Sequence, residues 1–272
     1  MKKRFIILFD FSEDAENLLK YAYDWSKQVG VEILLLHQTT VLVPAFADNE
    51  SRILLTNKTN SEALNKLETI VKRIFSSSLR VTYSVSEKPL QIRLQEYLDE
   101  AFENLIFIAL KKMTLTKKIL LGSTAIQLID KTNNNIVAMP KDISSFSHEQ
   151  IYVAVTEKKP LNILAFNNLL SFMDKSKTRI TFFYLADPNE ETKAIEKHLR
   201  DLTKLFATKF DASFTIYEKH NYFTDIKAVI NNKIDELLVI QKGSRHLTDQ
   251  LFRRFLIDDL VFEGQTPLII LP

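Results

Sequence analysis

The sequence contains no cysteine and only four glycines among its 272 residues. The lack of cysteine excludes disulfide bonds, thiol catalysis and cysteine-based zinc sites, and is typical of a protein that works in the reducing cytoplasm. Glycine lets a backbone approach phosphate groups closely, so its scarcity argues against a conventional glycine-rich nucleotide loop. We therefore expect a cytoplasmic protein with an unusual anion site, or with none.

The sequence also lacks an excess of charge of either sign, and it lacks long apolar runs. Lys and Arg number 36 against 34 Asp and Glu, a net charge of +2. Such a balance argues against a nucleic-acid binder, which needs a basic surface. No apolar run approaches the roughly 20 residues of a membrane-spanning helix. The five histidines lack metal-binding spacing, so we expect no metal site. From the balanced charge and the short apolar runs we expect neither a nucleic acid nor a membrane as partner.

What the sequence does contain is a pattern of short apolar runs alternating with amphipathic stretches, which occurs twice. The runs predict strands at residues 4–9, 31–37, 79–85, 105–110 and 136–139, and again at 151–155, 179–185, 214–217, 237–240 and 267–271. Alternation of strands and helices predicts an α/β fold with parallel sheets and helices on both faces. We interpret the chain as two tandem five-stranded domains, residues 1–140 and 151–272, joined by a polar linker at 141–150.

Local sequence signals predict both ends of the first helix clearly, but they do not show where the second helix begins. Ser12 is a favourable N-cap, and Gly30 stands where a C-cap glycine belongs. His37, at the end of the second strand, is most simply a residue that hydrogen-bonds strand to loop. Residues 41–59 have mixed character and predict a loop with at most a turn of helix.

Residues 5–38, FIILFDFSEDAENLLKYAYDWSKQVGVEILLLHQ, resemble the start of a universal stress protein. They share its first strand, its Asp-Phe-Ser turn, its helix and a second strand that ends in Leu-His. The resemblance implies the adenine nucleotide alpha hydrolase-like fold, with strand order 3-2-1-4-5 in each domain. It also implies that the domains pair through their final strands, here residues 135–140 and 266–272.

The resemblance further implies where a nucleotide would bind in the first domain. Asp10 corresponds to the aspartate that contacts the nucleoside, and Leu8 and Gln38 to neighbouring base-contact positions. The three glycines of the phosphate loop correspond to Ala109, Lys112 and Gly122, followed by Ser123 and Thr124. Two of these three glycines are therefore missing, and with them the room for close backbone approach to phosphate.

Two interpretations of the altered loop stay open. The cluster of Lys111, Lys112, Lys117 and Lys118 could replace backbone donors with ammonium groups, or it could be an ordinary solvated loop. In the second domain Thr156 stands at the aspartate position and Gln241 at the first glycine position, so we expect no nucleotide site there.

These observations favour a non-catalytic stress-response protein that acts as an interaction or regulatory scaffold. The alternative is a sensor that binds ATP or AMP through the first domain. No catalytic residue is identified, and slow ATP hydrolysis remains a third option that needs a bound nucleotide. A homodimer and unidentified protein partners are left open.

Overall fold

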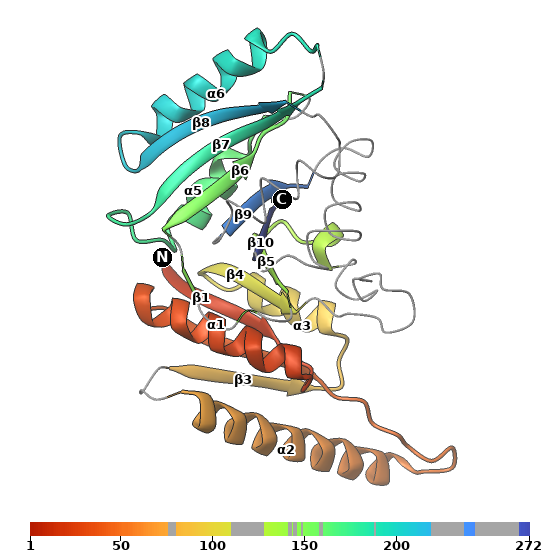
Figure 1. Cartoon of the computed structure of the whole chain (residues 1–272). Helices are drawn as coiled ribbons and strands as arrows, with labels where there is room; N and C mark the ends of the chain where they lie inside the picture. Colours follow the sequence, from red (N-terminus) through yellow and green to blue (C-terminus); the bar gives the residue numbers. More distant parts are fainter. Residues whose placement is uncertain are drawn as a thin grey trace.

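The protein is described here from a computed structural model. The structure describes residues 1–75, 80–109, 128–140, 143, 146, 147, 149–157, 160–187, 189–218, 237–242 and 267–272. Figure 1 shows two halves that lie side by side along one sheet.

Within the described ranges, the first half contains five strands and three helices. They are β1 (Lys2–Leu8), α1 (Glu13–Val29), β2 (Glu32–Gln38), α2 (Asn49–Ile74), β3 (Val81–Ser86), α3 (Leu90–Leu98), β4 (Phe102–Ala109) and β5 (Ile136–Met139). All pairs among these strands are parallel, in the order β3-β2-β1-β4-β5. The strand order 3-2-1-4-5 expected for this half is confirmed.

The second half repeats this arrangement. Its elements are β6 (Gln150–Ala154), α5 (Ile163–Leu170), β7 (Arg179–Ala186), α6 (Lys193–Phe206), β8 (Asp211–Glu218), β9 (Leu237–Gln241) and β10 (Leu268–Leu271). These strands pair in parallel in the order β10-β9-β6-β7-β8. Along the sheet, this is the strand order of the first half in reverse.

The two halves form one continuous sheet because β5 and β10 pair with each other. Their pairing is antiparallel, with Ile136 opposite Ile270 and Ala138 opposite Leu268. Within the part of the chain that the structure describes, the sheet therefore has ten strands, with β3 at one edge and β8 at the other. Both paired strands are fully buried. The pairing of final strands expected from the resemblance is thus observed.

Both faces of the sheet are covered, as expected for continuously apolar strands. In β1, Phe5 and Ile7 join a large core that α1, α2, α5 and α6 also enter. Ile6 points to the opposite face, into a smaller core containing Leu94 of α3. The caps of α1 are as predicted: Ser12 accepts a hydrogen bond from Ala15 N, and Gly30 ends the helix at φ 67°.

The prediction of a loop at 41–59 was wrong over most of its length. α2 begins at Asn49, where the Asp48 side chain caps it by accepting from Ser51 N. Its first three turns bury no side chain. A helical apolar period, which reports burial on one side, is therefore absent from this segment although the segment is helical.

The polar segment 141–150 also holds a residue whose role the sequence did not indicate. Phe146 is buried and stacks on Trp25, with ring centroids 4.2 Å apart. The Trp25 Nε1 donates to the carbonyl oxygen of Phe172 at 2.8 Å. Phe172 also lies 5.6 Å from Phe5 between ring centroids. This junction cluster, Phe5, Trp25, Phe146 and Phe172, packs the two halves against each other.

Candidate functional site

The candidate site lies where β1 and β2 end, at the carboxyl edge of the sheet. In doubly wound sheets this edge is where ligands bind. Asp10 is exposed here, and its Oδ1 accepts from Ser12 N at 3.1 Å and from Ser12 Oγ at 2.6 Å. Ser12 Oγ in turn accepts from Ala15 N. The carboxylate expected to contact a nucleoside therefore also holds the turn that starts α1.

Phe11, between Asp10 and Ser12, bridges three elements. It has a φ of 61°, which is rare for a residue with a side chain and orients the ring. The ring meets His37 at 4.5 Å between centroids, and the Lys66 ammonium lies 4.4 Å from its centre. The turn after β1 is thus packed against β2 and α2.

His37 links the end of β2 to the turn that follows β1. Its Nδ1 lies 2.7 Å from the carbonyl oxygen of Phe9, and because a carbonyl only accepts, Nδ1 carries the proton. The Phe9 N–H also donates to Leu36 O at 2.9 Å. The prediction that His37 hydrogen-bonds strand to loop is confirmed.

Of the two expected base-contact residues, Gln38 holds α3 in place and Leu8 packs against the same core as this helix. Gln38 Oε1 accepts from Leu90 N at 3.1 Å, at the start of α3. The N-cap residue of this helix, Pro89, makes no side-chain cap, so Gln38 supplies one from the neighbouring strand. Leu8 is partly buried and packs in the same core as Leu90.

Of the residues expected in the phosphate loop, the structure describes Ala109. Ala109, at the first glycine position, ends β4 opposite Met139 and packs against the large core. The other predicted residues of this loop lie outside the described residues. They are Lys112, Gly122, Ser123 and Thr124, together with Lys111, Lys117 and Lys118.

The corresponding edge of the second half is acidic. Burial raises the pKa of the Tyr184 phenol, with further contributions from Glu190, Glu157 and Asp187. The Tyr184 hydroxyl donates to Glu190 Oε1 at 2.6 Å. Three carboxylates close to the end of β7 disfavour a phosphate there by like-charge repulsion.

Gln241, at the first glycine position of the second half, also has a structural role. Its Oε1 accepts from Asn162 N at 2.6 Å, and its Nε2 donates to Pro160 O at 3.2 Å. It therefore holds the segment that leads into α5. Thr156, at the aspartate position, follows β6 by two residues.

Two negative findings apply to the described residues. No group of three or more His, Cys, Asp or Glu side chains among them is arranged to hold a metal ion. No helix in these same ranges is long and apolar enough to cross a lipid bilayer.

Comparison with known proteins was informative at the level of structure alone. No protein-family model and no curated protein matches the chain. A universal stress protein from Archaeoglobus fulgidus DSM 4304 aligns with a TM-score of 0.70 at 16% identity, covering 98% of this chain and 97% of its own.

Two proteins of Pseudomonas aeruginosa align over a similar extent. One, from strain UCBPP-PA14 and provisionally named a universal stress protein, gives a TM-score of 0.59 at 14% identity, with 99% of this chain and 93% of the other covered. The other, of unknown function from strain PAO1, gives 0.59 at 14%, with 99% and 92% covered. The chain is a doubly wound α/β protein, and over nearly its whole length it has the fold of the universal stress proteins.

Proposed function

We propose that this chain is a cytoplasmic, universal stress-type protein without chemistry of its own, which acts as an interaction or regulatory scaffold. The shared fold supports the class, since structural likeness extends over both halves. Fold alone does not define activity, so the functional proposal rests on the candidate site.

The observation that carries the proposal is the use of Gln38. A side chain that contacts a base offers its amide to the ligand, whereas the Gln38 oxygen already accepts from Leu90 N. Redirecting it toward a base would remove this cap from α3, whose N-cap residue Pro89 makes no side-chain hydrogen bond of its own. Leu8 is likewise partly buried, against the smaller core that Leu94 of α3 joins.

The second half supports the same conclusion from its electrostatics. Glu157, Asp187 and Glu190 all help to raise the pKa of Tyr184 near the end of β7, so negative charge gathers at this edge of the second half. We therefore propose that this half serves by pairing: β10 completes the sheet of the first half as a partner domain would in a pseudo-dimer.

A nucleotide sensor is the second candidate, and Asp10 favours it. Its carboxylate is exposed at the carboxyl edge of β1, where the resemblance places the nucleoside contact. Under this alternative, ATP or AMP would bind to the first half through Asp10 and the segment containing Lys112, Gly122, Ser123 and Thr124. Slow hydrolysis would require this binding first.

Calorimetric titration with ATP and with AMP, with and without Mg²⁺, separates the two candidates. The scaffold predicts no heat and no thermal shift at millimolar nucleotide. Micromolar binding that Asp10→Ala abolishes would overturn it and establish the sensor.

A matched control exists within the chain. Asp174 Oδ1 accepts from Ser176 N at 3.0 Å and from Ser176 Oγ at 2.7 Å, the same turn that Asp10 makes with Ser12. Asp174→Ala thus removes an equivalent turn elsewhere in the chain. Nucleotide binding lost equally in both variants would reflect lost stability, and loss in Asp10→Ala alone would identify a contact.

A further inference from the structure

The first half of α2 is a helix without a core to pack on. No side chain from Asn49 to Asn60 is buried, whereas Leu67, Ile70 and Val71 anchor the other end of the helix. A helical segment of this length is marginal in water unless something packs against it.

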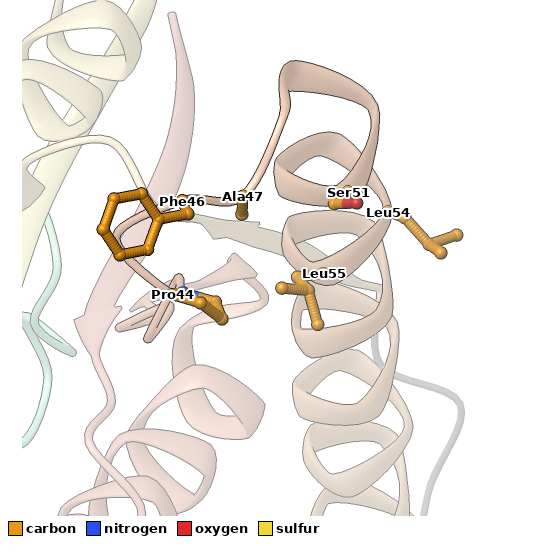
Figure 2. Close-up of a pocket in the computed structure, with 6 residues that line it drawn as sticks. All are labelled: Pro44, Phe46, Ala47, Ser51, Leu54 and Leu55. Carbon is orange, nitrogen blue, oxygen red and sulfur yellow. The ribbon is translucent and has the colours of Figure 1, made fainter.

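This segment and the loop before it expose large apolar side chains to solvent. Leu54 is 70% exposed, and Leu42, Phe46 and Ile53 are exposed as well. A hollow of about 480 Å³ lies between the helix and the loop before it. Figure 2 shows Leu55 directed toward Pro44 across this hollow, and Leu54 directed away from the loop. We name Leu42, Pro44, Phe46, Ala47, Ser51, Ile53, Leu54 and Leu55 the α2 patch.

Two charged residues of α2, Glu50 and Lys58, lie at equal distances in sequence on either side of Leu54. Glu50, Leu54 and Lys58 follow one another at four-residue spacing, so they form one stripe on the helix. An antiparallel copy of the helix, related by a two-fold axis at Leu54, places Leu54 against the partner's Leu54. The same operation places Glu50 opposite Lys58 of the partner subunit, and Lys58 opposite Glu50 of the partner subunit.

We propose that a second copy of this chain covers the α2 patch through this antiparallel pairing of the two α2 helices. A two-fold interface requires a self-complementary surface, and an apolar centre flanked by one acid and one base fulfils that requirement. Lys58 already lies 4.0 Å from Glu62, but this exposed contact is weak and leaves the ammonium available.

A membrane surface is a poorer occupant of the same patch. Interfacial helices that bind anionic lipid carry a predominantly basic polar face. Here Asp48 and Glu50 accompany Arg52 and Lys58, so the segment is close to neutral. The proposal does not depend on whether the protein binds a nucleotide.

Charge reversal tests the two-fold geometry directly. The wild-type chain is expected to sediment at twice its mass of 31.5 kDa. Glu50→Lys and Lys58→Glu each place like charges opposite one another, so each variant alone should sediment as a monomer. An equimolar mixture of the two should regain the doubled mass, because every facing pair is then again of opposite sign.

Further variants exclude trivial explanations. Leu54→Asp should abolish the dimer, while Leu164→Asp, at an 83% exposed position of α5, should leave it intact. Unchanged far-UV circular dichroism would show that the variants are folded.

Three outcomes would overturn the proposal. They are a wild-type chain that stays monomeric at all concentrations, a dimer that survives Leu54→Asp, and a mixture of the charge variants that stays monomeric. Flotation of a monomeric wild-type chain with anionic phospholipid vesicles would assign the patch to a membrane instead.

Discussion

Replacing Phe206 with alanine should shift the unfolding transition reported by Trp25, although the two residues belong to different halves. Trp25 is the only tryptophan of the chain and lies buried in the junction cluster. Phe206 lies in α6, where its ring meets Phe166 at 5.1 Å and Phe182 at 5.6 Å between centroids. If the continuous sheet makes the halves one cooperative unit, damage in one half must register in the other.

The expected magnitude follows from burial. Phe206 is 3% exposed, and truncating a buried phenylalanine to alanine costs about 3–5 kcal/mol. For a chain of this size the dependence of stability on urea is near the upper end of the usual range, about 3 kcal/mol per molar. The urea midpoint of Trp25 fluorescence should therefore fall by about 1–2 M in Phe206→Ala, taking these two principles together.

Urea titration followed by both tryptophan fluorescence and far-UV circular dichroism checks this expectation. The two probes should give one coincident transition in the wild type and in the variant. Leu164→Ala, at an exposed position, should leave the midpoint nearly unchanged and serves as the control. A circular dichroism transition that shifts while the Trp25 transition stays in place would refute the argument, because it would show that the halves unfold independently.

Three further changes test individual contacts. Arg4→Met should cost about 2–3 kcal/mol by urea titration, since it removes charge-assisted hydrogen bonds that a buried guanidinium makes to Asn104 and Glu100. Gln38→Ala should cost about 1 kcal/mol, the usual effect of losing a helix cap, and lower the melting temperature without changing the secondary structure. Tyr184→Phe concerns pH: burial raises the pKa of this phenol in the folded chain above its ordinary value of 10.0. The unfolded chain therefore loses this proton first, stability falls as pH rises above 10.0, and the variant should show a shallower fall in urea midpoint than the wild type. An equally steep fall in both proteins would contradict this assignment.

The sequence predicted those features that depend on neighbouring residues or on strong repetition. Ser12 and Gly30 identify the ends of α1 because capping is local chemistry, and buried parallel strands appear as unbroken apolar runs. The start of α2 at Asn49 was missed, because its first turns are helical without an apolar face toward the core. Phe146 was missed because its partner Trp25 is distant in sequence, and two apolar residues in a ten-residue polar segment do not make a period.

The candidate site shows the same limit. The family resemblance grouped Asp10, Leu8 and Gln38, and the structure places them at the ends of β1 and β2. That Gln38 caps α3 depends on a contact across 52 positions of sequence, which no spacing rule contains. A glutamine available to a ligand and a glutamine committed to a helix look identical in the sequence.

The antiparallel seam between β5 and β10 also bears on how such a protein behaves in a mixture of relatives. Two separate chains that pair through final strands dissociate on dilution and can exchange partners, whereas strands on one chain meet at an effective concentration fixed by their tether. Here Ile136 to Ala138 are already opposite their own Leu268 to Ile270. A single-domain protein of the same fold would therefore have to displace a strand that is already paired within this chain. The two unlike halves also stay in a one-to-one ratio at any concentration of the protein.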